Sequence, residues 1–169
     1  MADKSFKDII DSEDCKRPLE EFNTMLGLNC HAWDTLGKPI LPPIWGNTLC
    51  KAIKSVQPGL LTCAGSHKEM TREAKVTGQP VIRKCHAGLV KAVVPVIVDG
   101  KYMGMIGGCG SLPRGEKVDQ EYIKELAAKI GVAEEYLSVH LPSVGEVDVD
   151  DVSAKVREAL DSIGCVCKG

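Results

Sequence analysis

Hydrophobic residues recur every three or four positions over two long stretches of the chain, residues 5–26 and residues 60–76. This spacing places them on one face of a helix, so both stretches are predicted to be helical. Pro18 is expected to break the first stretch or to start a second helix, because proline has no backbone N–H. Gly78 and Pro80 follow the second stretch and are typical stop signals.

The middle of the chain carries shorter apolar runs that are typical of β-strands. Strands are predicted over residues 28–33, 81–84, 89–98 and 102–106. Asp99 and Gly100 separate the last two runs, and an Asp-Gly pair is a strong signal for a two-residue hairpin turn. The glycine-rich run 107–110 is expected to end the last strand.

Further helices are predicted before and after these strands. They cover residues 48–53, 119–130, 133–141 and 152–163, with an acidic linker at residues 142–151. Helices combined with an antiparallel sheet indicate an α+β fold. We expect a PAS-like or GAF-like antiparallel sheet flanked by helices, followed by C-terminal helices.

The overall charge and hydropathy argue against two classes of partner. Charged residues make up 26 % of the 169 residues and the net charge is −2, so there is no basic excess to hold nucleic acid. The apolar runs are too short to span a bilayer, and the N-terminus lacks the apolar segment of a signal peptide. We therefore expect a cytoplasmic protein that binds neither nucleic acid nor membranes.

Cysteine is unusually frequent, with eight residues in the chain. The reducing cytosol disfavours structural disulfides, so such thiols more often bind metal, perform redox chemistry or fill the core. Cys50 and Cys63 lie near predicted helix starts, whereas Cys85 and Cys109 end predicted strands. Their spacings do not match the short pairs of a zinc ribbon, but strand ends in one small sheet can be neighbours. Four thiolates would suit zinc or an iron–sulfur cluster, and the alternative is four buried core thiols.

Cys85 is followed by His86, Ala87 and Gly88, and the two small residues leave room beside the imidazole. His86 could bind the metal, hydrogen-bond a small molecule or be a core histidine. Adjacent residues on a strand point to opposite faces, so Cys85 and His86 are not expected to act as nucleophile and base for each other. Trp45 lies between a proline-rich stretch and a helix start, where it could cover a pocket or pack as an anchor.

Cys165 and Cys167 form a Cys-x-Cys pair at the end of the chain. An exposed pair of this kind can bind metal, exchange disulfides or have no function. His31 and His67 are assigned no role. The sequence contains no phosphate-binding loop, no nucleophile elbow and no His-Glu-x-x-His motif. A sensor or binding domain is therefore favoured over an enzyme.

Several segments together resemble the PocR sensory domain. They are the stretch from Leu49-Cys50 to Cys63, Gly78-Gln79-Pro80-Val81, Lys84-Cys85-His86-Ala87-Gly88-Leu89, Val94-Pro95-Val96-Ile97-Val98-Asp99-Gly100, and Gly104 to Gly108. The resemblance covers residues 14–112. It implies a PAS-like fold that senses a ligand, and the family is associated with small hydrocarbon derivatives such as propanediols.

The resemblance also implies that Cys50, Cys63 and Cys85 form one recurring group. Cys109 departs from the family pattern, in which a polar residue other than cysteine is expected after the Gly-Gly pair. A fourth thiolate would favour a complete four-cysteine metal or cluster site over an open pocket.

The resemblance divides the chain into three parts. These are an N-terminal helical segment (1–13), the PocR-like domain (14–112) and C-terminal helices with the Cys-x-Cys tail (113–169). Family members commonly carry a DNA-binding helix-turn-helix module or a histidine kinase after the sensor, and the last part is too short for either. We therefore expect a stand-alone sensor whose signal passes through the terminal helices to a protein partner or a second copy.

Our leading hypothesis is a stand-alone PocR-like sensor whose four central cysteines hold zinc or an iron–sulfur cluster, with His86 in or beside the site. Such a domain would respond to redox state or to a small molecule. In the first alternative the cysteines hold no metal and line a pocket for a small organic, propanediol-like ligand. In the second, the protein is a thiol-based enzyme or metal carrier that uses Cys165 and Cys167.

Overall fold

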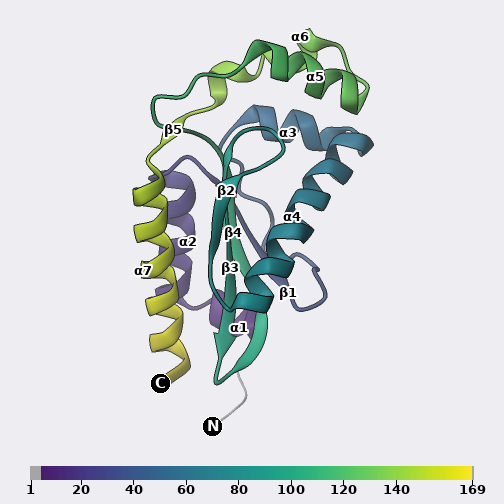
Figure 1. The fold of residues 1–169 in the computed structure, drawn as a ribbon. Coiled ribbons are helices and arrows are strands. Elements are labelled where there is room, and N and C mark those ends of the chain that lie inside the picture. The colour runs from purple at the N-terminus through teal and green to yellow at the C-terminus, as the bar shows by residue number, and fades with distance from the viewer. Residues whose placement is uncertain (1–4, 169) are drawn as a thin grey trace.

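A five-stranded sheet forms the centre of the molecule (Figure 1). The computed structural model describes residues 5–168, with side chains to residue 164. The strands are β1 (Asn29–Asp34), β2 (Val81–Lys84), β3 (Val90–Val98), β4 (Lys101–Pro113) and β5 (Glu146–Val147). The first four are antiparallel in the order β1-β4-β3-β2, and the short β5 pairs in parallel with β4.

A tight hairpin joins β3 to β4, as the sequence predicts. Val98 pairs with Lys101, which leaves only Asp99 and Gly100 in the turn. Both turn residues have positive φ, 49° and 76°. Asparagine, aspartate and glycine tolerate this left-handed geometry best, and it matches the twist of the two strands.

β4 is longer than the sequence predicts. The predicted end at residue 106 is wrong, because the strand continues through the glycine-rich run. Gly107 pairs with His31 of β1 and with Val93 of β3. Two neighbouring strands thus satisfy the backbone groups on both edges, and this pairing outweighs the weak strand preference of glycine. The extension carries Cys109 into the sheet between its two neighbours.

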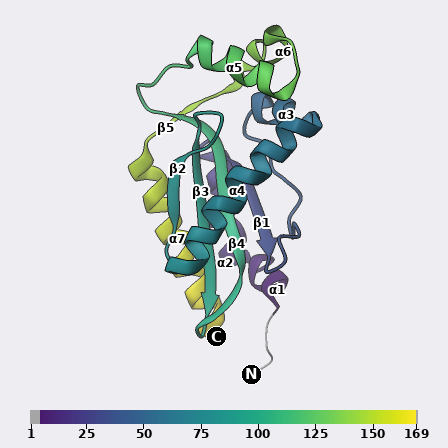
Figure 2. The same cartoon turned by 45° about the vertical axis from the view of Figure 1, so that its right-hand side comes forward.

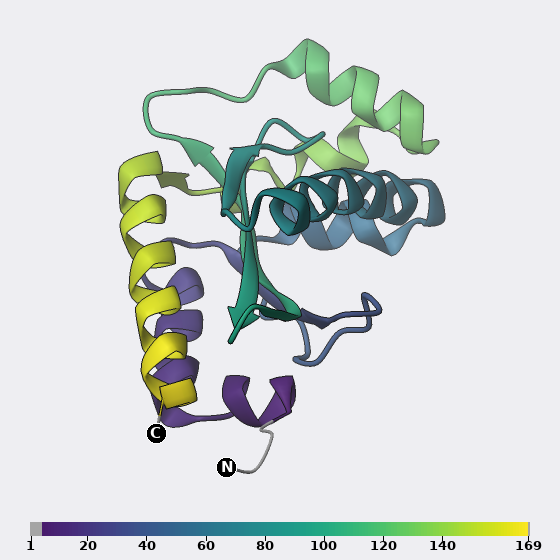
Figure 3. The ribbon, with the colours of Figure 1, turned by 60° about the horizontal axis from the view of Figure 1, so that its bottom comes forward.

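Helices α1 (Phe6–Ile10), α2 (Glu13–Thr24) and α7 (Val149–Lys168) cover one face of the sheet. Their apolar side chains and those of β1, β3 and β4 form one hydrophobic core. Phe22 and Ile106 are completely buried there. Figure 3 shows α2 and α7 side by side on this face, with the sheet between them and α4.

Pro18 lies inside α2, so the predicted helix break at this residue is wrong. The chain breaks at Ser12 instead, which has an extended backbone at the start of α2 (φ −66°, ψ 144°). The missing N–H of Pro18 removes a single hydrogen bond of the helix. The proline ring is buried, and this burial offsets the cost.

Helices α3 (Thr48–Ser55) and α4 (Gln57–Thr77) lie on the opposite face of the sheet. α4 ends at the predicted stop, Gly78, whose φ of 67° is left-handed. Beyond the end of the sheet, α5 (Gln120–Ile130) and α6 (Glu134–Ser138) pack against α3 in a second hydrophobic core (Figure 2). α3 therefore has one side toward the sheet and another toward α5 and α6.

The segment between α5 and α7 is more ordered than the sequence predicts. α6 ends earlier than the predicted helix, and a 3₁₀ turn follows at Leu141–Ser143. The predicted acidic linker contains β5 and the start of α7, because Leu112 and Pro113 of β4 provide partners for a short parallel pairing.

The α+β fold class is confirmed, and the architecture is consistent with a PAS-like sensor. Within residues 5–168, no helix combines the length and the apolar character that a membrane span needs. The side chains of α3, α4 and the sheet do not close completely against one another, and the candidate site lies between them.

Candidate functional site

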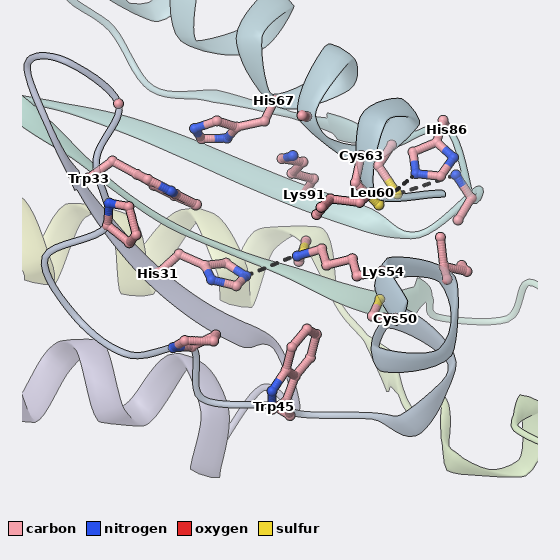
Figure 4. A pocket seen from close by; sticks show the side chains of 18 of the residues that line it. His31, Trp33, Trp45, Cys50, Lys54, Leu60, Cys63, His67, His86 and Lys91 are labelled. Atoms are coloured by element: carbon pink, nitrogen blue, oxygen red, sulfur yellow. Dashed lines mark hydrogen bonds between the residues drawn. The ribbon is translucent and has the colours of Figure 1, made fainter. Parts of the chain in front are cut away.

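A cavity of about 480 Å³ lies between the sheet and helices α3 and α4 (Figure 4). The loop from Gly37 to Trp45 covers one side of it. All the central residues that the sequence analysis singled out line this one cavity: Cys50, Cys63, Cys85, Cys109, His86 and Trp45. The structure thus brings together residues that are far apart in the sequence.

Two buried asparagines attach α3 to β4. The Asn47 side chain caps α3 by accepting from the Cys50 N–H at 2.7 Å, and its amide donates to the Gly110 carbonyl at 2.7 Å. Asn29 accepts from the Gly46 N–H at 2.6 Å. Capping stabilises the start of a helix, and these bonds also hold Cys50 against the sheet. The sequence analysis singled out neither asparagine as part of the site.

Cys109 lies buried at the floor of the cavity, in contact with three polar groups. The Asn29 amide is 3.7 Å from its sulfur and the His31 Nε2 is 4.0 Å away. The Cys50 thiol forms a hydrogen bond with the same sulfur, which lowers the pKa of Cys109 and raises that of Cys50. A proton shared in this way leaves at most one of the two sulfurs as a thiolate.

A second thiol contact joins Cys63 of α4 to His86. Its sulfur lies 3.0 Å from the His86 Nε2. Burial raises the pKa of Cys63 to about 11 and lowers that of His86 to about 4. Both groups are therefore neutral at pH 7, so the contact is not a thiolate–imidazolium pair. The His86 Nδ1 is buried and has no hydrogen-bond partner among the described residues.

Cys85 and His86 are not on a strand, and the inference that they face opposite sides is wrong. They belong to the turn after β2, which is closed by a hydrogen bond from the Gly88 N–H to the Cys85 carbonyl at 2.9 Å. Gly88 has a φ of 72°. In this turn the side chains do not alternate as they do along a strand, so both residues line the same cavity.

His31, Trp33 and His67 form a row of rings on the cavity wall, although the sequence analysis assigned neither histidine a role. Ring centroids are 4.9 Å apart for His31 and Trp33, and 4.0 Å for Trp33 and His67. Burial lowers the pKa of His67 to about 3, and its Nδ1 has no partner among the described residues. The spacing carried a signal: His31 and Trp33 share one strand face, and His67 is one helical turn after Cys63.

Lys91 is the least expected residue of the cavity. It is 8 % exposed and lies opposite Cys109 in the β3–β4 ladder. Burial lowers its pKa. Lys54 of α3 also lines the cavity, with its ammonium 5.2 Å from the Trp45 ring centroid. A lysine inside the apolar run of residues 89–98 was the available sequence signal, because lysine is almost never fully buried without a partner.

The expected metal centre gains no support from this arrangement. In the described part of the chain, no three histidine, cysteine, aspartate or glutamate side chains are grouped so as to hold a metal ion. The four thiols are instead engaged in separate contacts, such as Cys50 with Cys109 and Cys63 with His86. Zinc or iron–sulfur ligation stays a prediction. The side chains of Cys165 and Cys167 lie outside the described residues.

We expect the neutral, buried His67 to make stability depend on pH. Its pKa is about 3 in the folded protein against 6.5 ordinarily, so the unfolded chain takes up a proton first as pH falls. Above pH 6.5 the imidazole is neutral in both states and costs no stability. As pH falls from 6.5 to 3, protonation favours the unfolded chain, and the free energy of unfolding decreases. In urea unfolding, His67→Gln should flatten the slope of unfolding free energy against pH by up to roughly 1.4 kcal/mol per pH unit. If the unfolding free energies of the wild-type protein and His67→Gln change with pH in parallel, the prediction is wrong. The carboxylates are the same in both proteins, so they cannot cause a difference between the two slopes.

The comparison with protein families decides the classification. The model described as "Sensory domain found in PocR" matches residues 8–161. The chain belongs to the PocR sensory-domain family. The match extends beyond residues 14–112 at both ends, so it includes α2 and most of α7 as well as the sheet. Neither curated proteins nor solved structures show a match to the chain.

Family membership identifies the chain as a sensory domain. The cavity holds Cys50, Cys63, Cys85 and His86 from the segments that carry the resemblance. The three-part division of the chain stays a prediction. In this PocR domain, α1 and α7 share one hydrophobic core with the sheet.

Proposed function

We propose that this PocR domain senses a small organic molecule that binds in the cavity between the sheet and helices α3 and α4. The observation that carries the proposal is the cavity itself: its volume of about 480 Å³ falls in the usual range for small-molecule sites. Its walls include the apolar side chains of Trp45, Ile53 and Leu60. A few polar groups converge on it, as is typical of such sites.

α3 offers a route from the ligand to the rest of the protein. Ile53 lines the cavity and also belongs to the core that α3 shares with α5 and α6. A ligand that displaces α3 would therefore change the packing of α5 and α6, which a protein partner or a second copy could detect. Packed cores respond to such shifts by changing between discrete arrangements.

We expect a bulky residue at the cavity wall to abolish ligand binding. Ala64 lines the cavity from α4, whereas Lys68, one turn later, does not. Ala64→Phe should weaken binding at least tenfold, and Lys68→Phe should leave it unchanged because position 68 is exposed and does not line the cavity. Binding is measured by calorimetry and thermal shift with a panel of 1,2-propanediol, short alcohols and short carboxylates.

The same panel can contradict the proposal that the cavity is the sensory site. If no compound raises the melting temperature of the wild-type protein, or if Ala64→Phe binds as tightly as Lys68→Phe, the cavity is not the sensory site. Both variants should retain the far-ultraviolet circular dichroism of the wild-type protein, since neither position is buried.

A redox or metal sensor is the second candidate, because the four central thiols line one cavity. The test is anaerobic purification followed by metal analysis and an absorption spectrum. A brown protein that absorbs near 400 nm would support an iron–sulfur cluster, and a colourless protein with stoichiometric zinc would support a zinc site. Colourless, metal-free protein would exclude a zinc or iron–sulfur sensor.

A further inference from the structure

The ionisable side chains of the cavity are unbalanced in charge. Lys54 and Lys91 both line it, and among the described residues no aspartate or glutamate does so. Figure 4 shows both lysines extending into the space between the sheet and the helices. The cavity therefore presents two ammonium groups with no carboxylate to balance them.

Lys91 shows the imbalance most clearly. It is more than nine-tenths buried, and it forms neither a hydrogen bond nor a salt bridge with any described residue. Its ammonium keeps some accessible surface and has no partner among the described residues, and a charge in such largely buried surroundings is normally paired. Its cross-strand neighbour is Cys109. The Cys109 sulfur shares a proton with Cys50, so this pair supplies at most one negative charge against two lysines.

The two unpartnered imidazoles lie in the same cavity. Nδ1 of His67 and Nδ1 of His86 are buried without partners, while the Nε2 atoms contact Thr71 and Cys63. When Nε2 accepts the proton of its neighbour, Nδ1 carries the hydrogen of the neutral ring and is an unused donor. Lys91 lies within electrostatic range of both rings. The charged groups of the cavity, Lys54 and Lys91, are cations and therefore favour a ligand that is a negatively charged acceptor.

We propose that the sensed molecule is an organic carboxylate, with its anionic group against the Lys91 ammonium and its apolar body against Trp45, Ile53 and Leu60. This inference rests on the proposed function and names the class of ligand for that cavity. The carboxylate supplies the missing negative charge and accepts hydrogen bonds from the Lys91 ammonium. A cavity of about 480 Å³ has room for an apolar body of about six to ten carbon atoms.

Other ligand classes fit the lining less well. A neutral diol would leave the charge of Lys91 unbalanced. A phosphate is typically bound by arginine or by several backbone N–H groups, and no arginine is among the residues that line the cavity. The large apolar area around the two lysines favours a ligand with one small charged group and a large hydrocarbon part.

The test compares carboxylates with alcohols of matched shape by calorimetry at pH 7, on the full chain. The pairs are hexanoate with 1-hexanol and phenylacetate with 2-phenylethanol, and 1,2-propanediol is included. Wild-type protein should bind at least one carboxylate tenfold or more tightly than its matched alcohol. Lys91→Met, which shortens the side chain by one atom and removes its charge, should abolish this preference. Lys101→Met, at an exposed lysine outside the cavity, should retain it.

Stability provides a second measurement. Without ligand, Lys91→Met should melt at the same temperature as the wild-type protein or higher, because it removes a buried unpaired charge. If Lys91→Met binds the carboxylate more weakly but is as stable as the wild-type protein, Lys91 contacts the ligand and is not needed for the fold. If alcohol and carboxylate bind equally well, or Lys91→Met keeps the preference, the carboxylate assignment is wrong and the cavity remains a binding site. If no probe binds and Ala64→Phe changes nothing, the proposed function fails as well.

Discussion

Gly110→Ala is expected to destabilise the protein by about 3 kcal/mol, because this glycine has two separate reasons to lack a side chain. Its φ of 122° is a conformation that other residues rarely adopt. A Cβ atom would also meet the amide of Asn47 and lie 2.7 Å from that of Asn29. Neither amide can move without breaking the hydrogen bonds that attach α3 to the sheet. Urea unfolding measures the loss.

Gly115→Ala is the matched control. Gly115 also has a positive φ, 80°, but nothing lies within 4 Å of the position that its Cβ would take. Gly115→Ala should therefore destabilise the protein by only about 1 kcal/mol, which is the cost of placing alanine at a positive φ. The difference between the two variants therefore isolates the crowding at the junction of β4 and α3. Equal losses would show that Asn29 and Asn47 relax freely and that the junction is not rigid.

Asn47→Ala is expected to cost about 2–4 kcal/mol and to weaken ligand binding at the same time. The substitution removes the cap of α3 and leaves the Gly110 carbonyl without its donor in a buried place. The start of α3 carries Cys50 and leads into Ile53 and Lys54, which line the cavity. Loss of this anchor should therefore loosen the wall of the binding site. Unfolding in urea and calorimetry with the best probe of the panel measure both effects.

Two further variants show which role of Asn47 matters. Asn47→Ser keeps a capping oxygen but cannot reach the Gly110 carbonyl, so it should recover about half of the lost stability. Asp119→Ala removes the cap of α5, which bonds two backbone N–H groups in an exposed place. It should cost about 1 kcal/mol and leave ligand binding unchanged. An Asp119→Ala variant that weakens binding as much as Asn47→Ala would show that the effect is general destabilisation.

The local pattern of the sequence predicted most of the elements. The hairpin at Asp99 and Gly100, the helix that stops at Gly78 and the strand before Cys85 are all confirmed. Each depends on neighbouring residues and on the backbone freedom of one or two positions. The predictions failed at Pro18 and at the glycine-rich run, where tertiary contacts compensate for residues that disfavour the local structure.

The candidate site was predicted only in part. The positions of the residues picked out the four central cysteines and His86, and the family resemblance then grouped three of the cysteines, Cys50, Cys63 and Cys85. The sequence did not reveal Lys91, His31 or His67, because their spacing places them on a strand or helix face but does not show that this face borders a cavity. The partners of each group were also hidden, since Cys63 meets His86 across 23 positions of sequence.

By itself, the sequence determined the fold class, the family and most helix and strand positions of this protein. These depend on hydrophobic periodicity, turn residues and a set of motifs, which are properties of short segments. Only the tertiary structure decided that four cysteines, three histidines and two lysines share one cavity. It also decided that no carboxylate faces Lys91 there. The charge balance of a cavity depends on which side chains of distant segments point into it. In this protein, the register of β3 against β4 and the anchoring of α3 determine which side chains do so.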